Sequence, residues 1–154
     1  MATLPQSAID QYHEQGYYLH REPLFPEARF AELTSIFEEH LAKKGEKLGD
    51  QLDTPHFHDE RLLSFLLDDH VLDIVEDLIG PDIGLWSSHF ISKEARTGRQ
   101  TPWHTDAGYW DGRFDTFSGI VTVWLAIDRS DEENGCMRVI PGTHRDANGE
   151  YIPV

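Results

Sequence analysis

Apolar residues in the first half of the chain recur at helical spacing. Between Pro26 and Gly45 they fall three or four positions apart, which predicts an amphipathic helix that packs one face on a core. Similar but shorter patterns predict helices over residues 6–15, 60–67 and 70–79. The first half of the chain is therefore predicted to be mainly helical.

After residue 80 the apolar positions change from helical spacing to alternation. Alternating residues from Ile83 to Ser92 predict a half-buried strand, and residues 118–127 give the strongest strand prediction in the chain. A further short strand is predicted over Cys136–Ile140. Weaker patterns predict a strand over Tyr17–His20 and another that carries Pro102–Asp106.

This order, with helices first and strands afterwards, predicts the fold class. We expect an α+β protein in which N-terminal helices pack on an antiparallel sheet or barrel. The length of 154 residues indicates a single domain, with residues 1–80 as the helical cover and residues 81–154 as the first strands. Residues 46–58 and 107–117 are predicted to be long, irregular loops that flank any site.

Composition narrows the range of partners. The formal net charge of −15 argues against nucleic acid and anionic membranes, because both select basic surfaces. The chain has no apolar run of about 18 residues that would span a membrane, and its first residues lack the pattern of a secretory signal. A single cysteine, Cys136, excludes an internal disulfide. We therefore predict a cytoplasmic protein without nucleic-acid or membrane partners.

The candidate chemistry lies in Trp103-His104-Thr105-Asp106. Residues i and i+2 of an extended chain point to the same face, so the imidazole of His104 and the carboxylate of Asp106 can converge. This pair can supply two ligands of a 2-His-1-carboxylate iron site. A second His-x-Asp, at His144, lies between turn signals and is interpreted as a turn. The cluster His56–Asp59 is better explained as a loop in which Asp59 caps the next helix.

Several stretches together resemble the phytanoyl-CoA dioxygenase family. They are Trp103–Asp106, Trp124–Asp128 and the run Asn134–Arg145, and Gly16-Tyr17-Tyr18 after a short helix is similar too. The run Gly-Cys-x-x-Val-Ile-Pro-Gly-Thr-His is the most specific, because its spacing from the His-x-Asp pair also matches. The resemblance covers essentially the whole chain, but only the first part of a family domain.

This resemblance implies a fold and a chemistry. The fold would be an antiparallel double-stranded β-helix, a cupin-like jelly roll, incomplete at the C-terminus. The chemistry would be that of an oxygenase that uses Fe(II), the cosubstrate 2-oxoglutarate and O2. Halogenating relatives carry a small residue where this chain has Asp106, so the resemblance implies hydroxylation of a small organic substrate.

The resemblance also assigns roles to residues. His104 and Asp106 would be the catalytic metal ligands, His89 and Lys93 would lie near the cosubstrate, and three aromatic residues would wall the substrate pocket: Trp86, Tyr109 and Trp110. The plainer interpretations are that His89 is a core or rim histidine, that Lys93 is solvated, and that the three aromatic residues belong to the core. The family's third ligand, a His, and the Arg that binds 2-oxoglutarate are expected on a later strand, after Val154.

The absence of these two residues from the sequence leaves alternatives open. The chain is expected to be a truncated sequence, a short protein completed by a partner or by self-association, or a degenerate copy. A missing C-terminal segment or a second copy would complete the sheet, whose open edges would otherwise be exposed. Besides an oxygenase, the pattern permits a non-catalytic binding domain that keeps the fold. It also permits a zinc hydrolase that uses the same His and Asp donors.

Overall fold

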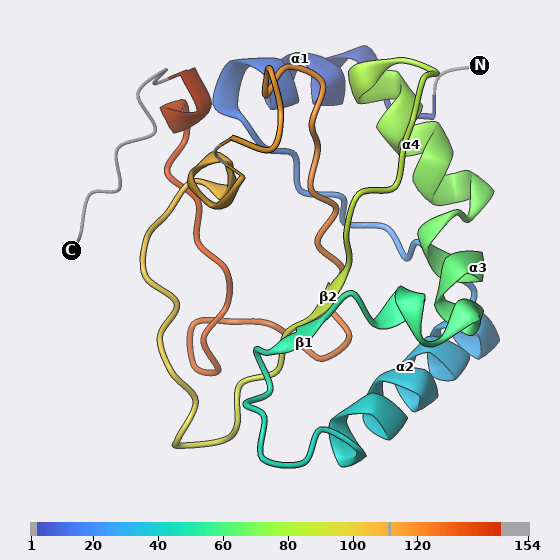
Figure 1. Cartoon of the computed structure of the whole chain (residues 1–154). Helices are drawn as coiled ribbons and strands as arrows, with labels where there is room; N and C mark the ends of the chain where they lie inside the picture. Colours follow the sequence, from blue (N-terminus) through green and yellow to red (C-terminus); the bar gives the residue numbers. More distant parts are fainter. Residues whose placement is uncertain (1–2, 111, 146–154) are drawn as a thin grey trace.

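Helices make up most of the regular structure in this protein. The computed structural model describes residues 3–110 and 112–145. Within these ranges there are four α-helices: α1 (Gln6–Gln15), α2 (Glu27–Ala42), α3 (Leu63–Leu66) and α4 (Asp69–Ile79). Four short 3-10 helices accompany them: η1 (Pro55–Phe57), η2 (Glu60–Leu62), η3 (Asp106–Tyr109) and η4 (Thr143–Arg145). Figure 1 shows the α-helices along two sides of the molecule.

The helix ends follow from the capping residues in the sequence. Gly16 adopts a left-handed φ of 85° and donates its N–H to Tyr12 O, which ends α1. The Asp68 side chain accepts from the N–H of His70 at the start of α4, and Gly80 ends that helix. The helices predicted over 6–15, over 70–79 and after Pro26 are confirmed. The predicted helix over 60–67 is present as η2 followed by α3.

One small antiparallel sheet joins the two halves of the sequence. Strand β1 (Leu52–Asp53) pairs with β2 (His89–Phe90), with Leu52 opposite Phe90 and Asp53 opposite His89. β1 lies in the stretch predicted to be an irregular loop, and its two residues are too few to give an alternating pattern. The α+β class with an antiparallel sheet is confirmed at this coarse level, whereas the jelly roll stays a prediction.

The core lies between α2, α3 and β2. The apolar face of α2 is buried through Leu33, Ile36 and Phe37, as its spacing predicted. Phe37 packs edge-on against Phe90 of β2, with ring centroids 5.3 Å apart. Other members of the cluster come from the segments around α2 and α3: Phe25, Leu62 and Phe65. Burial of these side chains is the main source of stability in this half of the protein.

Most of the predicted strands are wrong as strands. Among the described residues, the stretches 17–20, 103–106, 118–127 and 136–140 are not β-strands, and the strand predicted over 83–92 is reduced to β2. A strand is defined by hydrogen bonds to a neighbouring strand, so an alternating pattern without a paired neighbour remains an extended segment. The segments over 103–106, 118–127 and 136–140 run as long, unpaired connections in the yellow to red part of the chain (Figure 1).

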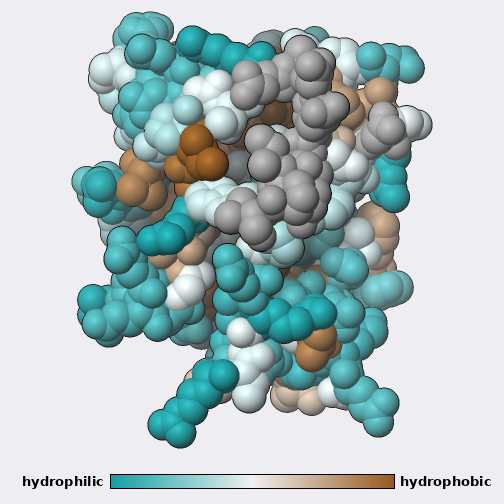
Figure 2. Space-filling view, turned by 90° about the vertical axis from the view of Figure 1, so that its left-hand side faces the viewer, coloured by the Kyte–Doolittle hydropathy of each residue, from teal (hydrophilic) through white to brown (hydrophobic). Residues whose placement is uncertain are grey.

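Apolar side chains on these segments are partly exposed. Val123 and Trp124 retain 51% and 45% of their accessible surface, and Ile140 retains 51%. The face shown in Figure 2 is mostly hydrophilic, with separate hydrophobic patches between the polar side chains. No helix in the described ranges is both long and apolar enough to cross a membrane.

Candidate metal centre

His104 and Asp106 converge as the sequence predicted, although not on a strand. The intervening Thr105 is extended, with φ −108° and ψ 137°, and η3 begins at Asp106. The extended backbone at Thr105 turns both side chains to one side, and His104 Nε2 lies 3.5 Å from Asp106 Oδ1. About a quarter of the His104 side chain and nearly half of the Asp106 side chain are exposed. The pair is therefore accessible to an ion.

In each side chain of the pair, the polar atom that points away from the partner makes a hydrogen bond. His104 Nδ1 lies 2.7 Å from the carbonyl oxygen of Pro102. A carbonyl oxygen only accepts, so Nδ1 carries a proton, and the neutral form of the ring has its lone pair at Nε2. On the other side, the Thr122 hydroxyl donates to Asp106 Oδ2 at 2.9 Å. Nε2 and Oδ1 are thereby left facing each other.

This geometry fits a divalent cation. Two lone pairs 3.5 Å apart repel each other unless a proton or a cation lies between them. Nitrogen and oxygen ligands lie about 2.0–2.2 Å from an ion such as Zn²⁺, so two adjacent ligands are about 3.0–3.5 Å apart. Among residues 3–110 and 112–145, no group of three His, Cys, Asp or Glu side chains is arranged to hold a metal. The described residues thus supply two donors, and a complete site needs more.

One aromatic side chain packs on His104, and others in this part of the chain pack on one another. The Tyr109 ring packs edge-on against the His104 ring, with centroids 5.1 Å apart. Trp86 and Trp110 both contact Phe114, at centroid distances of 4.9 Å and 6.2 Å. Phe114 therefore links two predicted pocket residues that lie on different segments. Phe114 was not among the predicted pocket residues, and its one signal in the sequence is its place in the aromatic loop over 107–117.

His89 and Lys93 are engaged in local contacts. His89 Nδ1 lies 2.8 Å from Asp53 Oδ1 across the β1–β2 pair, and its Nε2 lies 3.1 Å from Ser87 Oγ. Lys93 Nζ donates to Arg99 O at 2.7 Å and to Thr101 Oγ1 at 3.1 Å. No hydrogen bond joins His89 or Lys93 to His104 or Asp106 in the described part of the chain. Their roles toward a cosubstrate stay predictions.

The other histidine clusters have structural roles. His56 is 7% exposed and its Nδ1 lies 2.6 Å from Ser88 Oγ, away from any metal-binding group in the described chain. Asp59 caps η2 by accepting from the N–H of Arg61, as predicted. His144 lies in the short helix η4, where its Nε2 donates to His13 O at 3.1 Å, so the turn interpretation is confirmed. Asp146 lies outside the described residues.

Among the described residues, His104 and Asp106 are two donors that face each other, and no third potential ligand joins them. Comparison with protein families gives the assignment: residues 12–152 match the model described as "Phytanoyl-CoA dioxygenase (PhyH)", so the chain belongs to that family. The family implies a cupin-like fold and, at family level, an oxygenase of the Fe(II)- and 2-oxoglutarate-dependent type.

Several curated proteins are similar to this chain over part of their length. The peroxisomal phytanoyl-CoA dioxygenase of Bos taurus is 34% identical over 90 residues, which are 56% of this chain and 26% of the relative. The enzyme of Mus musculus is 36% identical over the same shares of the two chains. A probable alpha-ketoglutarate-dependent hypophosphite dioxygenase of Stutzerimonas stutzeri is 28% identical over 105 residues, 67% of this chain and 35% of the relative.

The aligned regions span only about a quarter to a third of these relatives. No solved structure matches the chain. The sequence therefore establishes the family. A match over this part of the relatives does not establish that this chain has their activity.

Proposed function

We propose that this chain carries part of the active site of an Fe(II)- and 2-oxoglutarate-dependent oxygenase that hydroxylates a small organic substrate. The observation that carries the proposal is the 3.5 Å approach of His104 Nε2 to Asp106 Oδ1, with the opposite atom of each side chain already hydrogen-bonded. Membership in a dioxygenase family supports iron as the metal. A relative named for alpha-ketoglutarate supports 2-oxoglutarate as the cosubstrate.

In this proposal each residue of the chain has a limited task. His104 and Asp106 hold the metal, and the carbonyl of Pro102 fixes the imidazole tautomer that can bind it. When bound, Fe(II) and 2-oxoglutarate supply the oxidation of a substrate C–H bond by O2. Trp86, Trp110 and Phe114 pack on one another and would form an apolar wall for the substrate.

We further propose that the third protein ligand and the arginine for the cosubstrate lie outside the described residues. The described part of the chain contains no group of three potential ligands. The family relatives extend well beyond the matched region. A further C-terminal segment or a neighbouring copy would then provide the missing His and Arg and pair with the extended segments.

An anaerobic titration of the chain with Fe(II) and 2-oxoglutarate tests the proposal. We expect a weak visible charge-transfer band, with metal affinity falling at least about 10-fold in His104→Ala and in Asp106→Ala because each variant removes one donor. His70→Ala and Asp82→Asn are matched controls on exposed residues elsewhere, and they should bind like the wild type.

Two outcomes would contradict the proposal. Equal metal binding by the His104 and Asp106 variants would place the metal elsewhere. Absence of Fe(II) binding, with normal Zn²⁺ binding and hydrolytic activity, would favour the zinc hydrolase hypothesis instead.

A further inference from the structure

The carboxylate of Asp106 is held by a residue that is remote from it in sequence. Thr122 lies 16 positions further along the chain, on the extended segment 118–127, and its hydroxyl donates to Asp106 Oδ2 at 2.9 Å. The same segment reaches the hydrophobic core, because Ile127 packs against the buried cluster around α2. The position of the hydroxyl is therefore set by the fold and does not depend on the local turn at Asp106.

This contact determines which carboxylate oxygen faces His104. An ionised carboxylate has two equivalent oxygens, and an exposed side chain such as Asp106 is otherwise able to rotate. The Thr122 hydroxyl occupies Oδ2, so Oδ1 is the atom 3.5 Å from His104 Nε2. A carboxylate held in this way presents one oxygen to a cation and keeps the neighbouring coordination positions open for other ligands.

We infer that Thr122 is a positioning residue of the candidate metal centre. The effect of Thr122 on metal binding rests on the proposed function. Its effect on the orientation of the Asp106 carboxylate does not require a metal. Residues that hydrogen-bond a metal ligand from outside orient it and typically change metal affinity by about 10- to 100-fold when mutated. Among residues 3–110 and 112–145, the two such groups are the Thr122 hydroxyl on the carboxylate and the Pro102 carbonyl on the imidazole.

The first test compares two substitutions without metal. Thr122→Val removes the hydroxyl and keeps the shape, whereas Thr122→Ser keeps the hydroxyl and removes only the methyl group. Three-bond NMR couplings across the Asp106 Cα–Cβ bond report whether the side chain stays in one rotamer. We expect one rotamer in the wild type and in Thr122→Ser, and averaged couplings in Thr122→Val and Thr122→Ala. A fixed Asp106 rotamer in Thr122→Val would overturn the inference.

The second test measures Fe(II) affinity of the same variants. Thr122→Val should bind about 10-fold or more weakly than the wild type, and Thr122→Ser should restore most of the affinity. If the wild type binds and Thr122→Val binds equally well, Thr122 has no positioning role. If the wild type itself does not bind Fe(II), the donors of this chain do not suffice to hold the metal, and the Asp106 couplings still decide whether Thr122 fixes the carboxylate. Amide spectra of the core residues confirm that each variant is folded.

Discussion

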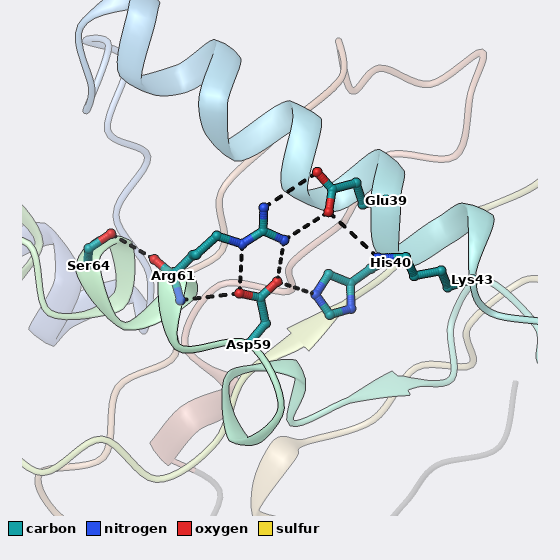
Figure 3. Close-up of polar contacts among 6 residues, drawn as sticks. All are labelled: Glu39, His40, Lys43, Asp59, Arg61 and Ser64. Carbon is teal, nitrogen blue, oxygen red and sulfur yellow. Dashed lines mark hydrogen bonds and ion pairs between the residues drawn. The ribbon is translucent and has the colours of Figure 1, made fainter.

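At the scale of single residues, the pKa of the Asp59 carboxyl is lowered by the groups that hydrogen-bond to it. Arg61 donates to both of its oxygens, through Nη2 at 2.7 Å and Nε at 2.9 Å, and His40 Nε2 lies 3.1 Å from Oδ2 (Figure 3). Arg61 also reaches Glu39 of α2 at 2.9 Å. The hydrogen bonds from Arg61 hold the pKa of Asp59 well below its ordinary range, and His40 adds to this effect. The network joins α2 to η2.

This network predicts a loss of stability in acid. The folded-state pKa of Asp59 is depressed, so its contribution is complete above the ordinary Asp pKa of about 3.9 and is lost as the pH falls below that value. Asp59→Asn should lower the free energy of unfolding by about 1 kcal/mol at pH 7, since Arg61 is half exposed and solvent screens the pair. Urea unfolding midpoints measured from pH 7 to pH 2 check this.

The matched control is Asp82→Asn, an exposed residue outside the network. It should keep the wild-type dependence of stability on pH, whereas Asp59→Asn should flatten it. An unchanged acid dependence in Asp59→Asn would show that other carboxyls dominate.

Residues whose geometry is local can be predicted from the sequence, and residues whose geometry is tertiary cannot. His104 and Asp106 converge because one extended residue separates them, and Asp59 caps η2 because it directly precedes it. Thr122 and Phe114 act through segments that are distant in sequence. No spacing rule relates them to the site, so their roles emerge only from the fold.

At the scale of elements, α1 ends against the turn formed by η4. His144 Nε2 donates to His13 O at 3.1 Å, and Gly142 N donates to Gln15 O at 2.8 Å. Figure 1 shows η4, in red, beside the end of the blue helix α1. These donors satisfy carbonyls that a helix end otherwise leaves to water. The Pro-Gly-Thr-His run thus caps the first helix.

This arrangement makes Gly16 difficult to replace. A Cβ added at Gly16 would clash with Nδ1 of His144. The φ of 85° at Gly16 also disfavours any residue other than glycine. Gly45 has a similar φ of 64° but open space around it. Gly16→Ala should destabilise by about 1 kcal/mol more than Gly45→Ala, because His144 must move and lose its hydrogen bond to His13. Urea unfolding of both variants measures the difference.

The double variant Gly16→Ala with His144→Ala gives the control. It should lose most of the difference between the two glycine positions. Equal effects of Gly16→Ala and Gly45→Ala would show that His144 does not contribute to the end of α1.

Helices were predicted well and strands poorly for the same physical reason. The hydrogen bonds of α4 close within four residues, so the pattern over 70–79 is sufficient to predict it. The stretch 118–127 has a stronger apolar pattern, but a strand requires a second segment in register. In the described ranges only Leu52–Asp53 and His89–Phe90 meet that requirement.

At the scale of the whole molecule, stability is concentrated in the helical half. Ile36 of α2 is 1% exposed, whereas Ile140 in the second half is 51% exposed. Ile36→Ala should cost about 2–5 kcal/mol through lost burial and a cavity. Ile140→Ala should change stability by less than about 0.5 kcal/mol. Chemical unfolding of this matched pair checks the location of the core, and similar losses at both positions would contradict it.

The cap that η4 places on α1 also determines an order of events during synthesis. The carbonyl of His13 receives its hydrogen bond from a residue 131 positions later in the chain. At ribosomal rates of about 5–20 residues per second, the donor is made on the order of ten seconds after the helix. The α2–α3 cluster, apart from Phe90, is complete by Phe65 and so forms while the last turn of α1 is still hydrated. The start of α1 can pack on α4 soon after Asp77 is made, whereas the hydrogen bonds at its C-terminal end wait for the last described residues of the chain.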